Sequence, residues 1–391
     1  MFTRRDFLRT SSLLALAPAV PGFLARTARA AQPERDGRVL VVIQLDGGND
    51  GINTVVPFAD EGYAKHRKVL RLPKERLVKV NDKVGLHPSL GEFGKLLEAG
   101  KLAVVQGVGY PNPNRSHFRS MAIWHTARLD AEEQAGLGWL GRGLDEVPGA
   151  SSLLVGAGPP PVALRGRRAV ASAVERVEDF TLAAGADPRK ALPRDEPADD
   201  LAAFVRRSML DAYATADRLK EVGREDGARY PQTGLANRLR LIARLLKTRV
   251  GARVFYTTQG SYDTHSAQIG THARLLFDLA GAVRAFLDDL TAARLADRVA
   301  VLCFSEFGRR VQENGSSGTD HGTAGPVFLA GPGVKGGLVG QTPSMVDLEA
   351  GDLKMGLDFR RVYAAVLEDW LGLPAKTALA GTFDRLPLFR T

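Results

Sequence analysis

The stretch RVLVVIQLDGGNDG at Arg38–Gly51 decides which fold this sequence is expected to adopt. Its first part, Arg38–Leu45, is an unbroken apolar and β-branched run, which is typical of a strand buried on both faces of a parallel sheet. The run ends at Asp46 in a glycine-rich turn. The stretch therefore predicts a central strand with a carboxylate at its carboxyl end.

Further strands and helices are predicted to alternate along the rest of the chain. Four more apolar runs have the length of buried strands: Leu102–Val108, Ala252–Thr258, Val299–Phe304 and Val327–Ala330. Helical apolar spacing is found in four segments: Pro88–Lys101, His117–Ala127, a stripe from Leu276 to Leu290, and Phe359–Leu371. This alternation predicts the fold class α/β, a three-layer α/β/α domain with a mostly parallel central sheet.

The first thirty residues are predicted to be a signal peptide. Thr3–Leu8 (TRRDFL) is a twin-arginine pattern, and the apolar run after it is short and broken by Pro18 and Pro21. Residues 28–30 (ARA) supply small residues for cleavage before Ala31. We therefore expect export by the twin-arginine machinery to the periplasm or the cell exterior, with no stable transmembrane anchor.

Residues 31–391 are expected to form the α/β domain. Within it, residues 149–250 contain short apolar runs, an acidic stretch with prolines and two amphipathic segments, Leu201–Val222 and Leu235–Lys247. This part of the chain is interpreted as a helical insertion or cap on the main domain.

Composition narrows the range of partners. The formal net charge is +9, yet the sequence contains no dense Lys/Arg stripe with interleaved aromatic residues, which argues against nucleic-acid binding. A positive net charge is compatible with an anionic substrate or an anionic envelope surface as the partner. The single cysteine, Cys303, lies in an apolar run, which predicts a buried thiol and no intramolecular disulfide.

Polar side chains are predicted to gather where the parallel strands end. Asp46, Asp263 and Glu306 each follow a strand within a few residues, and Ser116 follows another after a longer loop. In open α/β sheets, ligands bind outside the carboxyl ends of the strands. We therefore expect these side chains to converge on one edge of the sheet, although they are far apart in sequence.

The same edge is expected to bind a divalent cation, because carboxylates and imidazoles are ligands of such ions. The polar stretch Ser305–Gly322 adds an adjacent Asp-His pair, which on its own is more often a surface ion pair. Beside the strand-end carboxylates it completes a candidate ligand set: Asp46, Asp263, His265, Glu306, Asp320 and His321. One or two ions are expected, and zinc, calcium, magnesium and manganese all stay open.

Ser116 is the candidate nucleophile. A hydroxyl beside a metal can lose its proton near neutral pH and attack a phosphorus or sulfur ester. Ser116 is expected in the first turn of a helix, where backbone N–H groups attract an anion; an ordinary N-cap is the alternative. Bidentate contacts to the substrate's oxygens are predicted for Arg115, Arg119, Arg309 and Arg310, although each of them on its own is more typical of a solvated or salt-bridged side chain.

His272 leaves two alternatives open, since it lies four residues before Leu276 on a predicted buried stripe and can be a core histidine or a ligand.

Other functional classes are excluded by missing motifs. Gly47–Gly51 lacks the G-x-G-x-x-G spacing of dinucleotide-binding turns, and neither a phosphate-binding P-loop nor a G-x-S-x-G elbow occurs.

Five motifs together resemble those of one bacterial family: LDGGNDGIN at Leu45–Asn53, NRSHF at Asn114–Phe118, YDTH at Tyr262–His265, SEFGRR at Ser305–Arg310 and GTDHG at Gly318–Gly322. Following a twin-arginine pattern, they are similar to domain-of-unknown-function family 1501. That family looks related to the alkaline-phosphatase-like superfamily of metal-dependent phosphatases, sulfatases and phosphomutases. The resemblance implies an alkaline-phosphatase-like fold and a serine nucleophile.

The resemblance also implies roles for the candidate residues. Ser116 would be the nucleophile, and Asp46 the ligand after the first strand. Asp263 and His265 would bind one metal, and Asp320-His321 the other, with Glu306 as a further ligand or a carboxylate behind the ligands.

Two departures from the superfamily pattern keep alternatives open. Asp263 and His265 are only two residues apart, and no histidine follows His321. Either His272 or His117 takes the place of the late histidine, or a single metal binds. The C/S-x-P-x-R signature of formylglycine sulfatases is also absent.

Two functions are therefore carried forward. The first is an exported metal-dependent hydrolase that cleaves an anionic phosphate or sulfate ester through Ser116. The second is a catalytically inactive relative that acts in envelope assembly or polymer binding, with an envelope protein as its partner.

Overall fold

The computed structural model describes residues 37–130, 136–175, 227–248 and 251–390. Strand β1 (Val39–Leu45) is buried along its whole length. It pairs in parallel with β8 (Ala252–Gln259) on one side and β9 (Val299–Phe304) on the other. The prediction of a central strand buried on both faces is confirmed.

The central sheet is almost entirely parallel. Its order is β11-β5-β10-β9-β1-β8-β6-β7, with β14 also paired to β5. Among the described pairings of this sheet, only those of β10 with β5 and β9 are antiparallel. The remaining strands have these bounds: β5 Leu102–Gly109, β6 Ser151–Val155, β7 Val170–Val174, β10 Gly325–Ala330, β11 Gly337–Val339 and β14 Leu357–Asp358.

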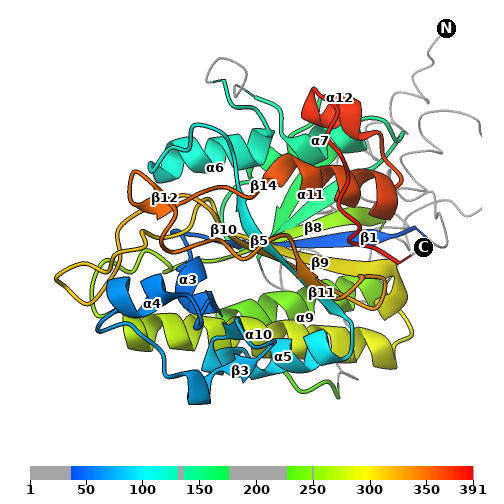
Figure 1. Ribbon diagram of the computed structural model, residues 1–391. Coiled ribbons are helices and arrows are strands. Elements are labelled where there is room, and N and C mark those ends of the chain that lie inside the picture. The colour runs from blue at the N-terminus through cyan, green and yellow to red at the C-terminus, as the bar shows by residue number, and fades with distance from the viewer. Residues whose placement is uncertain (1–36, 131–135, 176–226, 249–250, 391) are drawn as a thin grey trace, which may run out of the picture.

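Helices cover both faces of this sheet (Figure 1). One face carries α6 (His117–Thr126), α7 (Trp139–Leu144), α11 (Phe359–Ala365), the π-helical turn Val366–Trp370 and α12 (Ala375–Leu379). The other face carries α5 (Gly91–Glu98), α9 (Gly234–Lys247) and α10 (Gln268–Ala292). Each face has its own apolar core, so the three-layer α/β/α prediction is confirmed.

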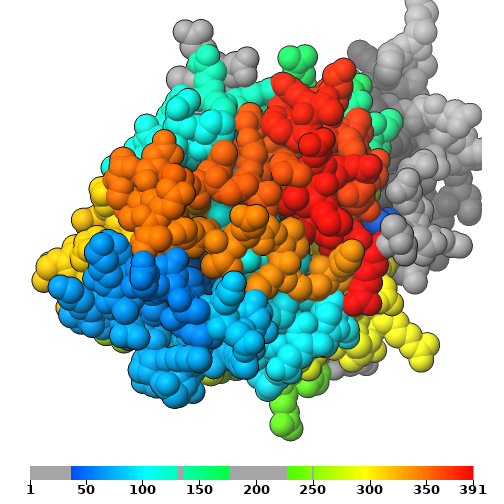
Figure 2. Space-filling model, in the orientation of Figure 1, coloured from blue at the N-terminus to red at the C-terminus, as the bar shows by residue number. Residues whose placement is uncertain are grey.

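Smaller elements surround the carboxyl edge of the sheet. A hairpin-like sheet joins β2 (Val55–Val56), β4 (Gly85–Leu86) and β3 (Val78–Lys79), next to α3 (Gly51–Thr54) and α4 (Glu61–His66). A second hairpin pairs β12 (Leu348–Glu349) with β13 (Asp352–Leu353). Figure 2 shows this later part of the chain in orange, lying on the surface between the blue segment of α3 and α4 and the cyan segment of α6.

The region 149–250 differs from the prediction of a separate cap. Its strands β6 and β7 extend the central sheet, because β6 pairs in parallel with β8 and with β7. Helix α9 packs on the same sheet and against α10. The runs SSLLV and VASAV are short and mix apolar with small residues, so their own composition does not mark them as strands; β6 is held by the distant β8, and β7 is held by β6. The predicted helix Leu201–Val222 and the predicted signal peptide lie outside the described residues.

Other local predictions match the structure closely. Helix α10 buries Leu276, Leu279, Val283 and Leu290, the stripe expected from their spacing. Cys303 is a buried free thiol in β9. Within the described parts of the chain, no helix combines the length and the apolarity needed to cross a bilayer.

Packing of β1 against the helices should contribute strongly to stability. Leu40 is fully buried in the core on the α6 face, so we expect Leu40→Ala to lower the free energy of unfolding by about 2–5 kcal/mol. Urea denaturation followed by circular dichroism measures this change. The control Val69→Ala, at a side chain that is 57% exposed, should change it by less than about 0.5 kcal/mol; equal effects of the two variants would contradict the assignment.

Candidate metal centre

The loops that follow β1, β8 and β9 meet at the carboxyl edge of the sheet with their backbones in close contact. Gly47 has a φ of +117°, and a Cβ there would lie 2.5 Å from the backbone nitrogen of Asp263. Only glycine fits this conformation and this approach. The glycine-rich turn after β1 therefore exists to let the loop carrying Asp263 come close.

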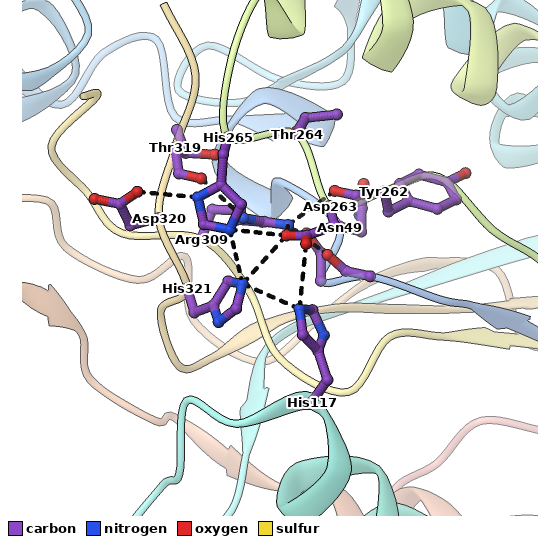
Figure 3. A network of polar contacts seen from close by, with 12 residues as sticks. Asn49, His117, Tyr262, Asp263, Thr264, His265, Arg309, Thr319, Asp320 and His321 are labelled. Carbon is purple, nitrogen blue, oxygen red and sulfur yellow. Dashed lines mark hydrogen bonds and ion pairs between the residues drawn. The ribbon is translucent and has the colours of Figure 1, made fainter. Parts of the chain in front are cut away.

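Four side chains from three segments converge at this edge (Figure 3). His321 Nε2 lies 3.0 Å from the Nε2 atoms of both His117 and His265. Asp263 Oδ1 lies 3.1 Å from His321 Nε2 and 3.0 Å from His265 Nε2, while its Oδ2 lies 3.6 Å from His117 Nε2. Ligand atoms of His117, Asp263 and His321 all lie within 4.8 Å of one another. The group is a candidate metal centre.

The other nitrogen of each imidazole faces an acceptor. Nδ1 of His117 lies 2.7 Å from Glu306 Oε1, and Nδ1 of His265 lies 3.1 Å from Asp320 Oδ1. His321 Nδ1 lies 2.8 Å from the carbonyl oxygen of Arg115, which can only accept. Neutral imidazoles in this arrangement carry their proton on Nδ1, so the three Nε2 atoms present lone pairs to one another.

This arrangement fits a divalent cation. Three facing lone pairs and a carboxylate repel one another unless a positive charge lies between them. Histidines that ligate metals usually donate their second N–H to a carboxylate or a backbone carbonyl, which fixes the tautomer and the ring orientation. All three histidines here meet that condition. Three imidazoles and one carboxylate are a donor set suited to zinc and similar ions.

Electrostatics keep the carboxylates of the centre charged. Partial burial raises the pKa of Asp263, but the hydrogen bond and the charge of Arg309 oppose it, and the pKa lies below its usual range. Hydrogen bonds from Asn314 and His265 likewise lower the pKa of Asp320. The hydrogen bond to Glu306 raises the pKa of His117 above 6.5, against the opposing effect of burial.

Arg309 is fully buried and holds the loops of the centre together. Its Nε donates to the carbonyl of Gly48 at 2.6 Å, and its Nη1 to the carbonyl of Thr319 at 2.8 Å. Nη2 donates to Asp263 Oδ1 at 2.7 Å and also to two further carbonyls, those of Gly47 and Tyr262. These contacts direct its donors to the protein, whereas the sequence had suggested contacts to a substrate.

A second buried network lies behind the centre. Asp50 and Arg67 form an ion pair with both side chains fully buried and Nη1 2.5 Å from Oδ2. Burial raises the pKa of Asp50, but the charge and hydrogen bonds of Arg67 bring it down to about 2. His272 Nε2 lies 2.9 Å from Asn49 Oδ1, and burial lowers the pKa of His272 to about 4. His272 is therefore a core histidine with a side-chain partner.

The structure brings together some of the predicted ligands and separates others. Asp263, His265 and His321 face one another. Glu306, which also accepts from the backbone N–H of Gly47, and Asp320 lie behind the histidines that they orient. Asp46 is exposed, accepts a hydrogen bond from Gln44 at 3.1 Å and is not in the group of mutually close ligand atoms.

Ser116 is exposed and occupies the N-cap position of α6, yet its hydroxyl makes no capping hydrogen bond. The arginines predicted to hold a substrate have other partners. Arg115 bonds to Asp352, Arg119 donates to the carbonyl of Leu129, and Arg310 donates to the carbonyl of Ala350. Arg115 also contacts the centre through its backbone, because its own carbonyl accepts from His321.

His117 is the residue that the predicted ligand set omitted. The sequence had offered it only as a substitute for a missing late histidine. Its position directly after Ser116 in the NRSHF motif was the available signal, since a residue in the first turn of α6 must lie at the same sheet edge as the serine.

Residues 37–380 match the model of a family described as "Protein of unknown function (DUF1501)", and the chain belongs to this family. The family resemblance carried by the five motifs is thereby confirmed. Among curated protein sequences, none matches the chain.

Several solved structures are similar in fold. One is the C-terminal periplasmic domain of EcEptC from Escherichia coli in complex with zinc, with 9% identity, a TM-score of 0.41, and coverage of 86% of this chain and 83% of that one. Another is a protein in the alkaline phosphatase superfamily from Vibrio parahaemolyticus, at 11% identity, TM-score 0.37 and coverage of 88% and 69%. A third is the PsFucS1 sulfatase from Pseudoalteromonas sp., at 12% identity, TM-score 0.39 and coverage of 95% and 77%. The functional proposal below rests on the site itself.

Metal binding can be tested without any substrate. We expect His321→Ala to abolish tight zinc binding, because it removes one imidazole of the centre. Asp320→Ala should weaken binding by about 10- to 100-fold, since it removes the partner that orients His265. Competition with a chromophoric chelator measures both affinities.

The matched control is His66→Ala. His66 bonds to Gln312 away from the centre, so this variant should bind zinc as the wild type does. An equal loss in His66→Ala and His321→Ala, or a wild-type protein that binds no divalent cation, would contradict the assignment of the centre.

Proposed function

We propose that this protein is an exported metal-dependent hydrolase of phosphate or sulfate esters that uses Ser116 as its nucleophile. The observation that carries the proposal is the convergence of three imidazole Nε2 atoms and the Asp263 carboxylate, one of the imidazoles being that of His117, the residue next to the exposed Ser116. The twin-arginine pattern at the N-terminus supports the exported location.

In this proposal His117, His265, His321 and Asp263 hold a single divalent cation. The bound ion would stabilise negative charge on the ester's oxygens and favour the deprotonated form of a neighbouring hydroxyl. The donor set favours zinc over calcium or magnesium, which prefer oxygen ligands. The mutual orientation of the ligands comes from Glu306, Asp320 and the Arg115 carbonyl.

The chain fixes Ser116 at the centre through its two sequence neighbours. The carbonyl of Arg115 is held by His321 at 2.8 Å, and the imidazole of His117 is part of the centre. The serine is exposed and its hydroxyl makes no capping bond, which supports its assignment as the nucleophile. The N–H groups in the first turn of α6 favour an incoming anionic ester at the same place.

The reaction then follows from Ser116. Its hydroxyl gives its proton to water, and its oxygen bonds to the phosphorus or sulfur atom as the bond to the ester oxygen breaks. The alkoxide that leaves with that electron pair takes a proton from water to become the alcohol. Water subsequently cleaves the serine ester and releases the inorganic acid. We assign Arg309 to holding the loops, because its donors bond to protein carbonyls and Asp263. Arg115 is the arginine best placed to contact the substrate.

Replacement of the nucleophile tests the proposal. With zinc-loaded protein and a panel of aryl phosphates and aryl sulfates, we expect Ser116→Ala to lower turnover by about 100-fold or more, because the attacking oxygen is gone. The zinc content of the variant should stay that of the wild type.

The control Ser89→Ala removes a serine from the turn Pro88–Leu90 and should leave turnover unchanged. Full activity in Ser116→Ala would overturn the role of the serine. A zinc-loaded wild type that cleaves no ester would instead support the inactive, envelope-binding alternative.

A further inference from the structure

A polar cavity adjoins the candidate metal centre. Its volume is about 630 Å³, within the range of pockets that bind small molecules. Two of its lining residues also contact the centre: Glu306 orients His117, and the carbonyl of Arg115 accepts from His321. A ligand in this cavity therefore lies next to whatever reacts at Ser116.

Two segments that are far apart in the sequence line this cavity, and an ion pair joins them. One wall is the loop 109–115 that leads to Ser116, and the other is the β12–β13 hairpin with the residues after it. Arg115 Nε donates to Asp352 Oδ2 at 2.9 Å, and Nη2 donates to the same oxygen. The ion pair thus connects the β12–β13 hairpin to the loop that precedes Ser116.

This ion pair leaves hydrogen-bonding capacity on both partners. Asp352 is buried, and its Oδ1 accepts no hydrogen bond from the described residues. Arg310 Nε lies 3.8 Å from that oxygen, beyond hydrogen-bond distance. Arg115 Nη1 has no hydrogen-bond partner in the part of the chain that the structure describes. The Asp352 oxygen is closed to solvent, whereas the Arg115 side chain is 40% exposed, so Arg115 Nη1 is the donor of this pair that a ligand in the cavity can meet.

The chemistry of these groups selects the ligand. An apolar group would displace water from the Arg115 guanidinium and the Glu349 carboxylate without replacing its hydrogen bonds, which is unfavourable. An additional anion would meet the carboxylate of Glu349, while Lys354 of the same lining is already paired with Asp347. A hydroxyl group both donates and accepts, so it can satisfy a carboxylate oxygen and a guanidinium together. The amide of Asn112, which also lines the cavity, has the same dual capacity.

We propose that this cavity binds the hydroxyl-rich, sugar-type alcohol portion of the ester while the phosphate or sulfate group lies at Ser116. The inference rests on the proposed function and adds the class of substrate to it. Glu349, Asn112 and the Arg115–Asp352 pair are then the residues that select the alcohol.

A comparison of two kinds of ester tests the proposal. Glucose 6-phosphate and glucose 6-sulfate carry hydroxyl groups for the cavity, whereas phenyl phosphate does not. We expect Glu349→Gln and Asn112→Gly to raise KM for the glucose esters by about 5- to 10-fold, in keeping with the loss of a hydrogen bond. Glycine is chosen at Asn112 because the residue has a φ of +52°. The value of kcat/KM for phenyl phosphate should stay within about twofold of the wild type.

The matched control is Glu98→Gln. Glu98 is an exposed acid at the end of α5, just before β5 begins at the opposite edge of the sheet, so its replacement should leave both substrates unaffected. Equal changes in KM for phenyl phosphate and the glucose esters in the cavity variants would overturn the proposal.

A second readout separates a failure of the cavity from a failure of the chemistry. Saturation-transfer NMR with methyl glucoside, which contains no ester, reports binding in the cavity whether or not the protein turns over any substrate. We expect a signal with the wild type and its loss in the Asn112→Gly/Glu349→Gln double variant. No signal with the wild type, or an unchanged signal in the double variant, would overturn the proposal even if aryl esters are cleaved.

Discussion

The buried guanidinium of Arg309 is the interaction on which the functional edge of this protein depends. It donates to carbonyls from the loops after β1, β8 and β9 and to the carboxylate of Asp263. Burying an arginine is unfavourable unless its donors are all directed to acceptors. Here the acceptors are one carboxylate and several backbone carbonyls. The same contacts fix Asp263, around which the three histidines are placed. A second buried arginine, Arg67, is stabilised in a similar way by its ion pair with Asp50.

Much of the fold could be predicted from the sequence because its signals are local. An unbroken apolar run marks β1, and the spacing of Leu276, Leu279 and Val283 marks α10. Strands β6 and β7 lie in a region that was interpreted as a helical insertion or cap, because β6 pairs with β8, a strand far along the chain, and β7 joins the sheet through β6. Local composition cannot report such a partner.

The location of the site could be predicted from the sequence, whereas the roles of its individual residues could be predicted less well. Parallel strands end at one edge, so Asp263 and His321 could be expected to meet there. What a carboxylate faces, however, depends on side-chain direction. Glu306 follows β9 directly, yet it is buried behind His117 and accepts from the Gly47 backbone. Asp46 follows β1, yet it lies with Gln44, whose side chain contacts His125 and Tyr256 on the α6 side.

The central claim is that the protein itself sets the tautomers of three histidines so that their Nε2 lone pairs face one cation. Long-range ¹H–¹⁵N NMR of the metal-free protein, labelled at histidine and held at alkaline pH, measures this directly. We expect the Nδ1–H tautomer for His117, His265 and His321, and a shift of all three Nε2 resonances when zinc is added. Nε2–H tautomers at these positions, or resonances that zinc leaves unchanged, would contradict the claim.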